Sequence, residues 1–294
     1  MSDIRTLSIE DARYPASLKE IFDAPAQLFV RGNIDTLSHP CCVAVVGTRR
    51  CSSYGAAMTT RISGELAARG VCIVSGLALG VDTSAHSAAL AAGGTTIAVL
   101  GCGIADADIY PATNGALARR IIESGGAIVS EYEVGTPAYP SHFLDRNRII
   151  AALSRGTLVT EAPMKSGALA TARRALEYNR DVYAVPGEIT SYRSAGTNNL
   201  IKQGALCVTQ TDDILDTIES SYLTALPKHG TEQALSENEQ AVMDAIRTAP
   251  AVHFDDILGS TGLDAGAASS AIIALTLAGA IQETEPNTYA IVSL

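Results

Sequence analysis

The sequence predicts an α/β protein with a mostly parallel, doubly wound sheet, followed by a small winged-helix-like domain. Short apolar runs rich in Val and Ile recur along residues 41–220, and a Gly-rich turn follows most of them. Helical patterns lie between these runs, whereas residues 236–294 show three helices and a β-hairpin. Near-continuous apolar strands separated by helices are typical of a parallel sheet that is covered on both faces.

The pattern of residues 1–40 predicts a short N-terminal extension. The stretch from Asp11 to Phe22 has the pattern of a short helix, and the stretch from Ala24 to Gly32 has that of a strand. So short a segment cannot bury a core of its own, so we expect it to pack on the domain that follows.

Residues 41–220 predict the main domain. A helix over 56–68 follows the first strand, a helix over 113–124 stops at Gly125, and a helix over 167–179 presents Leu169, Ala172 and Leu176 on one face. The predicted strands are residues 43–46, 71–75, 95–100, 127–131, 157–161, 181–185 and 205–208. Sheets of this type bind ligands at the carboxyl ends of their strands, which is where the Gly-rich turns fall.

Residues 221–235 predict a linker, and residues 236–294 predict the winged-helix-like domain. Ser236 and Glu239 have the spacing of a capping box that opens a helix. The other expected elements are helices at 254–258 and 268–278 and strands at 279–282 and 288–292.

The negative charge is concentrated in the tail. The chain carries a formal charge of −10. Residues 231–294 hold nine acids and one base, a sum of −8, so the rest of the chain carries only −2. The main domain can therefore still carry a basic patch.

The six cysteines show no C-x-x-C spacing and no His at a zinc-like distance. We expect them to be small buried hydrophobes in a reducing cytosol, with no metal bound. The sequence has no apolar stretch long enough to span a bilayer and no signal-peptide pattern at Met1. These features predict a cytoplasmic protein.

The first turn, after the strand at 43–46, predicts an anion site. Gly47, Thr48, Arg49, Arg50 and Ser53 occupy this turn, and the next helix starts directly after it. Backbone N–H groups and the helix dipole favour negative charge there, and the arginines add donors in a fork geometry.

The second turn contains Ser75 and Gly76 and leads to Asp82 and His86. Asp82, or a neighbouring hydroxyl, is expected to cap the next helix. His86 lies one turn further on, either paired with Asp82 or as a packed structural histidine. The third turn is a lone G-x-G at Gly101, without the third glycine of a dinucleotide fingerprint, so no NAD or other cofactor is expected.

Residues 140–148 combine arginines with an aromatic ring. Phe143, Arg146, Asn147 and Arg148 lie within six residues. Arginines for phosphates and a ring for stacking bases are typical of single-stranded nucleic-acid binding. The alternative is that Phe143 belongs to the core and one arginine is merely solvated.

Two later turns carry similar features. Lys165, Ser166 and Gly167 open a helix, which is another anion-site arrangement. The last turn joins residues 186–188 and 194–199, with Arg193 and Lys202 flanking it. Glu131 and Glu161 end two of the predicted strands. For each we expect capping or the orientation of a nearby arginine, with a catalytic role as the alternative.

Taken together, these motifs resemble the DprA/Smf family over about residues 40–210. The resemblance rests on Gly47-Thr-Arg-Arg with Ser-Tyr-Gly55, Ser75-Gly-Leu-Ala-x-Gly-x-Asp-Thr-x-Ala-His86, Ile97-Ala-Val-Leu-Gly-x-Gly103 with Tyr110-Pro, Ile128-Val-Ser-Glu-Tyr132, Arg146-Asn-Arg-Ile-Ile-Ala151, and Ala184-Val-Pro-Gly187 with Gly196-Thr-Asn198.

The resemblance implies an extended Rossmann-like domain that binds single-stranded DNA and delivers it to the RecA recombinase in natural transformation. It implies a homodimer and a protein that is not an enzyme. Carried over by position, the DNA-binding residues would be Gly47, Thr48, Arg49, Arg50, Ser53, Ser75, Gly76, Phe143, Arg146, Asn147, Arg148, Lys165, Ser166 and Gly167.

Two features depart from this family. The N-terminal region is shorter than the helical domain of many members. The charge of −8 on residues 231–294 is unsuited to gripping phosphates. We therefore expect the acidic domain to act on protein or to shield the basic site.

The alternative is an enzyme, a nucleotide phosphoribohydrolase of the related lysine-decarboxylase-like Rossmann group. Glu131 or Glu161 would then assist glycosidic cleavage. The P-G-G-x-G-T signature of that group is absent, because Glu188 follows Pro186-Gly187. For the dimer surface, residues 197–220 are a candidate, with apolar positions that the domain itself could instead cover.

Overall fold

The structure is a computed structural model that describes residues 4–218, 236–247, 249, 251–277, 281–285 and 287–291. The chain forms two compact units, Met1–Gly230 and Thr231–Leu294. The predicted linker, residues 221–235, lies outside the described residues.

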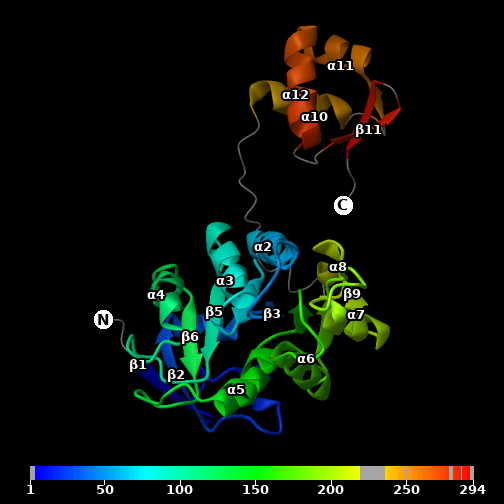
Figure 1. Cartoon of the computed structure of the whole chain (residues 1–294). Coiled ribbons are helices and arrows are strands. Elements are labelled where there is room, and N and C mark those ends of the chain that lie inside the picture. The colour runs from blue at the N-terminus through cyan, green and yellow to red at the C-terminus, as the bar shows by residue number, and fades with distance from the viewer. Residues whose placement is uncertain are drawn as a thin grey trace. The chain divides into compact units, whose positions relative to one another are not determined.

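The larger unit is built on one sheet of nine strands (Figure 1). The strands are β1 (Ile4–Ser8), β2 (Gln27–Gly32), β3 (Cys42–Val46), β4 (Cys72–Ser75), β5 (Thr96–Leu100), β6 (Ala127–Ser130), β7 (Gly156–Val159), β8 (Asp181–Ala184) and β9 (Leu206–Cys207). Their order is β1-β2-β6-β5-β4-β3-β7-β8-β9, and β3 to β9 pair in parallel. Each of the seven strands predicted over 41–220 is confirmed within two residues.

Helices cover both faces of this sheet, as predicted. One face carries α2 (Ser53–Ala68), α3 (Val81–Ala91), α4 (Gly115–Glu123) and the short α8 (Asp212–Leu215). The other carries α1 (Ala16–Lys19), α5 (Pro140–Ala152), α6 (Gly167–Glu177) and α7 (Ala195–Lys202). Alternate residues of β3 pack into the cores on the two faces, because successive side chains of a strand point to opposite sides.

The N-terminal extension packs on the main domain, as expected, and also adds strands to its sheet. Its predicted helix and strand are confirmed as α1 and β2. β2 pairs antiparallel with β6, and β1, which the sequence did not indicate, pairs with β2. Leu7, Leu18 and Leu28 are fully buried in the shared core.

The predicted face of α6 is confirmed at Ala172, which is fully buried, and at Leu169, which packs on the core, but the prediction is wrong for Leu176. Leu176 is 62% exposed, and the helix buries the small residues Ala168 and Ala175 beside Ala172. Small side chains let α6 approach α5 closely, so this contact outweighs the burial of the larger leucine.

The prediction for the cysteines holds for Cys41, Cys42, Cys72 and Cys102, which are buried. Cys51 is half-buried, and the prediction is wrong for Cys207, which is exposed on β9 at the edge of the sheet. Among the described residues, no single helix is long and apolar enough to cross a membrane.

The smaller unit has the predicted winged-helix pattern. It contains α10 (Glu237–Ile246), α11 (Phe254–Thr261) and α12 (Ala265–Leu277), with a sheet of β10 (Val252–His253), β12 (Thr288–Ile291) and β11 (Ile281–Glu285). The capping box is confirmed, since the backbone N–H of Ser236 donates to Glu239 over 2.7 Å and that of Glu239 donates to the Ser236 hydroxyl over 3.3 Å. Residues 278–280 and 292 of the predicted elements lie outside the described residues.

Candidate nucleic-acid interface

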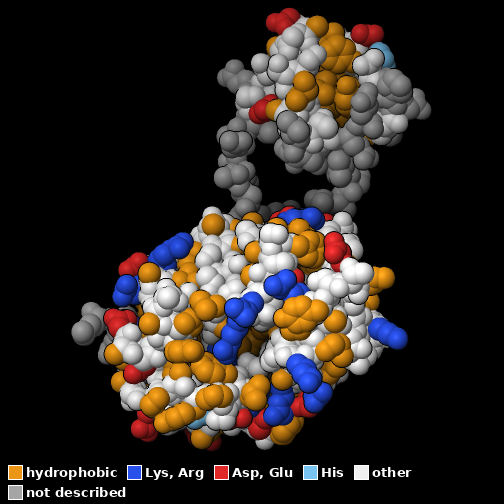
Figure 2. Space-filling model, viewed as in Figure 1, with side chains coloured by type: hydrophobic (Ala, Val, Ile, Leu, Met, Phe, Trp, Pro, Cys, Tyr) orange, Lys and Arg blue, Asp and Glu red, His pale blue; other side chains and the backbone are white. Residues whose placement is uncertain are grey.

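A cleft of about 620 Å³ opens where the strand order reverses, at the carboxyl ends of β3 and its neighbours. Open α/β sheets bind ligands at such switch points. We call it the basic cleft. It is lined by Val46, Gly47, Thr48, Arg49, Arg50, Ala78, Asp82, Tyr110, Ala138, Pro140, Phe143, Leu144, Arg146, Asn147, Ile150, Pro163, Lys165, Ser166, Gly167, Ala168 and Thr171. Figure 2 shows Lys and Arg side chains gathered on one face of the larger unit, with hydrophobic side chains between them.

The first turn is fixed from two sides by backbone hydrogen bonds. The N–H of Thr48 donates to the carbonyl of Glu161 over 2.8 Å, and the Thr48 carbonyl accepts from the N–H of Val81 over 3.3 Å. Gly80 has a φ of +76°, and a Cβ there would collide with the backbone of Thr48 and Arg49. The turn is therefore held rigidly, while the side chains of Arg49 and Arg50 reach solvent.

Glu161 stabilises this turn through side-chain hydrogen bonds. Its carboxylate is 2% exposed and accepts from both the N–H and the hydroxyl of Ser52, each over 2.7 Å. The Ser52 hydroxyl in turn accepts from the N–H of Gly55 and caps α2. Of the two expected structural roles, Glu161 therefore takes part in capping, through the N-cap residue of α2, and does not orient an arginine.

The second turn is organised by Asp82, in a different way from the prediction. Asp82 does not cap its own helix, whose N-cap residue is Gly80 and which has no side-chain cap. Its carboxylate accepts from the N–H groups of Gly76 and Ala78 over 3.1 and 3.3 Å, because the chain folds back over the first turn of α3. His86 pairs with Thr96 over 2.7 Å, which confirms the packed structural histidine.

Arg146 lies beneath the cleft as a buried cation. It is 3% exposed, and its Nη1 donates to the carbonyls of Gly76, over 2.8 Å, and of Val99. Burial lowers the pKa of Arg146 to about 10, against the attraction of nearby Asp82. Arg146 therefore remains charged at neutral pH and ties α5 to the second turn.

Phe143 stands at the centre of the charged groups. The guanidinium carbons of Arg49 and Arg146 lie 5.1 and 5.9 Å from its ring centroid, and the Tyr110 ring lies 5.7 Å away. The ring is half-buried and lines the cleft, so it is not confined to the core. Cations over a ring face hold it in place while its remaining surface stays open to a base.

The start of α6 supplies the opposite wall. The Ser166 hydroxyl caps the helix by accepting from the N–H of Ala168 over 3.3 Å. The amide of Asn147 donates to the carbonyl of Gly167 over 3.3 Å and joins α5 to α6. Lys165 is exposed beside this cap, so a phosphate at the helix terminus would meet both dipole and charge.

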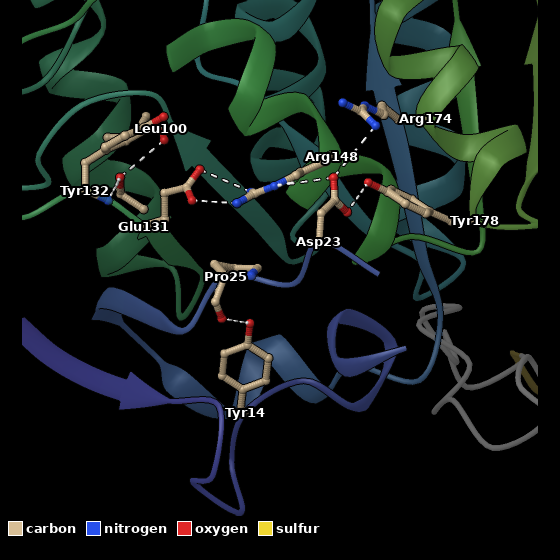
Figure 3. Close-up of polar contacts among 10 residues, drawn as sticks. Tyr14, Asp23, Pro25, Leu100, Glu131, Tyr132, Arg148, Arg174 and Tyr178 are labelled. Carbon is tan, nitrogen blue, oxygen red and sulfur yellow. Dashed lines mark hydrogen bonds and ion pairs between the residues drawn. The ribbon is translucent and has the colours of Figure 1, made fainter. Parts of the chain in front are cut away.

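Arg148 does not line the cleft. Its guanidinium makes a two-pronged ion pair with Glu131, at 3.1 and 2.6 Å, and lies 3.8 Å from Asp23 (Figure 3). Asp23 also accepts from the Tyr178 hydroxyl over 2.6 Å and lies 3.7 Å from Arg174. The expectation that Glu131 orients an arginine is confirmed. The cluster ties the N-terminal extension to α5 and α6.

The structure separates two more of the expected residues from the cleft. Ser75 is fully buried and donates to the carbonyl of Val45 over 2.6 Å. Ser53 lines a different cavity on the other side of the first turn. Gly76 lies in a small pocket that adjoins the cleft and shares Arg49, Tyr110 and Phe143 with it.

Tyr110 is a candidate binding residue that the sequence did not indicate. It lines the cleft, is 48% exposed and contacts Phe143. Its only signal in the sequence was the Tyr-Pro dipeptide after the third turn. That signal gives no hint that the side chain returns to α5.

Comparison with known proteins identifies the family of the chain. Residues 5–219 match the family described as DNA recombination-mediator protein A, and residues 227–285 match the DprA winged helix domain. The chain belongs to the DNA recombination-mediator protein A (DprA/Smf) family. It is 47% identical to DNA processing protein DprA of Streptococcus pneumoniae over 73% of this chain and 74% of that protein. It is 42% identical to protein Smf of Escherichia coli over 85% of this chain and 63% of that one.

Two solved DprA structures share the fold. The X-ray structure of DprA from S. pneumoniae matches with a TM-score of 0.67 and 45% identity over 73% of this chain and 74% of that chain. A structure of DprA from Helicobacter pylori, described by its unique single-stranded DNA binding mode, matches with a TM-score of 0.67 and 33% identity. That match covers 76% of this chain and all of the other.

Proposed function

We propose that this member of the DprA/Smf family binds single-stranded DNA in the basic cleft. The observation that carries the proposal is the Phe143 ring, which lines the open cleft with the guanidinium carbons of Arg49 and Arg146 at 5.1 and 5.9 Å from its centroid. Arg49, Arg50 and Lys165 reach solvent around it and are suited to phosphates. The base stacks on Phe143 or Tyr110, so sequence preference is weak.

The named relatives support this proposal. The H. pylori protein, whose structure concerns its single-stranded DNA binding mode, shares the fold over 76% of this chain. We further propose that the bound strand is passed to RecA in recombination and natural transformation, in line with the recombination-mediator description of the family. The check is RecA filament formation on strand covered by single-strand binding protein, with and without this chain.

The proposed homodimer uses the β9 edge of the sheet. Of the apolar residues in the candidate surface, Leu200, Ile214, Leu215 and Ile218 are covered by the domain itself. Leu206 on β9 remains 39% exposed, and an edge strand offers unpaired backbone groups to a second copy. Light scattering of Leu206→Lys tests this contact.

The proposal does not include catalysis. Glu131 is paired with Arg148, and Glu161 is bound to Ser52, so both carboxylates have assigned partners. A nucleotide hydrolase would need one of them to act on a glycosidic bond. Release of free base from nucleoside monophosphates is the assay that would reveal such an activity.

The direct test is fluorescence anisotropy with a labelled single strand and a duplex of the same sequence. We expect preference for the single strand. Three phosphate contacts, at Arg49, Arg50 and Lys165, predict a log–log salt slope of about −2. Equal affinity for the duplex, or no binding at low salt, would overturn the proposal.

A further inference from the structure

A second cavity of about 430 Å³ lies on the other side of the first turn. It is lined by Ser52, Ser53, Tyr54, Glu161, Gly187, Glu188, Ser191 and Ser194, and we call it the serine cavity. Residues of one turn therefore face two cavities, since Thr48 to Arg50 line the basic cleft. The opposite wall is the turn after β8, with Gly187, which the proposed DNA site does not use.

Tyr54 gives this cavity a fixed aromatic face. The ring is 44% exposed, and its hydroxyl donates to the carbonyl of Pro186 over 2.7 Å. The bond joins the start of α2 to the turn after β8, so the ring is held before any ligand arrives. A preorganised ring loses little conformational freedom when a base stacks on it.

Two exposed arginines lie between the cavities. Arg50 lines the basic cleft, and its backbone carbonyl accepts from Nε of Arg193 over 3.2 Å. The Arg193 guanidinium also lies 5.8 Å from the ring of Tyr192, which is 67% exposed. Arg193 directly precedes Ser194 of the serine cavity, so this hydrogen bond joins residues that border the two cavities.

The charges in the serine cavity select a base over a phosphate. Glu161 and Glu188 place carboxylates in its lining, which repel a phosphate group. The hydroxyls of Ser53 and Ser191 offer donors and acceptors of the kind that base edges use. A nucleotide with its base inside and its phosphate on Arg50 and Arg193 satisfies both requirements.

We propose that the serine cavity holds the base of a second nucleotide of the strand bound in the basic cleft, with the connecting phosphates on Arg50 and Arg193. This inference rests on the proposed function and extends it. The DNA strand then follows one path across the first turn, with one base stacked on Phe143 on one side and another stacked on Tyr54 on the other side.

The test compares a short oligothymidylate of about four nucleotides with one of about fifteen, since folds that bind single strands cover roughly this range. Anisotropy competition is measured for wild type, Tyr54→Ala, Tyr54→Phe and Arg193→Ala. Arg120→Ala is the matched control, because Arg120 is an exposed arginine of α4 that lines neither cavity.

We expect Tyr54→Ala and Arg193→Ala to weaken binding of the long oligomer at least about fivefold and to leave the short one unchanged. Arg120→Ala should retain wild-type affinity, whereas Tyr54→Phe keeps the ring but loses the hydrogen bond to Pro186 and should weaken binding of the long oligomer less than Tyr54→Ala does. Wild-type affinity of Tyr54→Ala and Arg193→Ala for both lengths would overturn the inference while leaving the proposed function intact. An equal loss for both lengths would also overturn it. Failure of the wild type to bind either length would overturn both proposals.

A second measurement locates the strand directly. An oligonucleotide that carries 5-iodouracil at one position is crosslinked by light, and the attached peptide is identified by mass spectrometry. Crosslinks at Tyr54 from one position and at Phe143 from another are expected. Crosslinks confined to residues of the basic cleft would overturn the second site.

Discussion

At the residue scale, exposure divides the charged groups of the cleft into two sets. Asp82, Arg146 and Glu161 are buried and hold the turns in place through hydrogen bonds. Arg49 and Lys165 are exposed and have charge to offer a ligand. Variants of the first set should therefore change stability, and variants of the second set should change affinity.

Glu161→Gln is expected to lower the free energy of unfolding by about 2 kcal/mol. The carboxylate accepts from two donors of Ser52, and an amide keeps only one acceptor oxygen and loses the charge. Urea unfolding measures the loss. Glu188→Gln is the control, because this exposed side chain lines the same cavity and should change stability by less than about 0.5 kcal/mol.

The lowered pKa of buried His86 predicts that the folded protein becomes less stable as the pH falls below neutral. Burial, with a contribution from the charge of Arg146, lowers the pKa of His86 to about 3. Between this value and the unfolded pKa of about 6.5, the unfolded state binds a proton that the folded state does not, so stability decreases as the pH falls.

The contribution of His86 is about 2 kcal/mol lost between pH 7 and pH 5. His86→Leu should remove this part of the pH dependence in urea unfolding, whatever its stability at pH 7. An unchanged pH dependence in the variant would contradict the assignment.

The residues of the cleft were largely predictable because they lie in turns that follow buried strands. Arg148 was misplaced for a geometric reason. It follows Arg146 by two positions on α5, and helix residues two apart do not face the same side. Arg146 thus lies under the cleft while Arg148 meets Glu131, a partner that the sequence does not place beside it.

At the element scale, the close approach of two turns decides the geometry of the cleft. Gly80→Ala should destabilise the domain and weaken DNA binding, because φ is +76° and the new Cβ would press on the backbone of Thr48 and Arg49. Gly93→Ala is the matched control at the other end of α3, with a φ of +70° and open space around it.

Both alanine variants carry the cost of a positive φ, about 1 kcal/mol in the left-handed region, and this cost is larger for Gly80→Ala because the ψ of Gly80 is −120°. Only Gly80→Ala should lose further stability and DNA affinity, measured by urea unfolding and anisotropy. Equal effects of the two variants would show that the contact between the turns is unimportant.

The elements were predicted well where strand patterns were strong and less well where packing chose between faces. Apolar β-branched runs marked β3 to β8 within two residues. On α6 the prediction failed only at Leu176, which is exposed because the helix packs on α5 with its alanines buried. In β1 only Leu7 is buried, so the segment shows no alternating pattern in the sequence, and its pairing with β2 defines it.

At the scale of the whole molecule, the acidic unit is not built to bind phosphates. In a helix-turn-helix fold, the recognition helix enters the major groove. The last helix here, α12, contains no charged residue, and its Ile273 is 59% exposed. The charge of −8 on residues 231–294 opposes DNA further.

Deletion of residues 231–294 should therefore leave the affinity for single-stranded DNA unchanged or raise it. The larger unit has its own core and contains the whole basic cleft, so the deletion removes no residue of the site. Anisotropy at low salt, where electrostatic repulsion is strongest, is the measurement. A clear loss of affinity would show that the acidic unit contributes to binding of single-stranded DNA.

The central claim is that a base stacks on Phe143 within the basic cleft. The most direct measurement is the anisotropy of a labelled single strand with Phe143→Leu, beside Phe22→Leu as control. Phe22 is 76% exposed and lies outside the cleft, against Tyr178. The account predicts a loss of at least about fivefold for Phe143→Leu and no change for Phe22→Leu. Wild-type affinity in Phe143→Leu, with the fold intact, would contradict it.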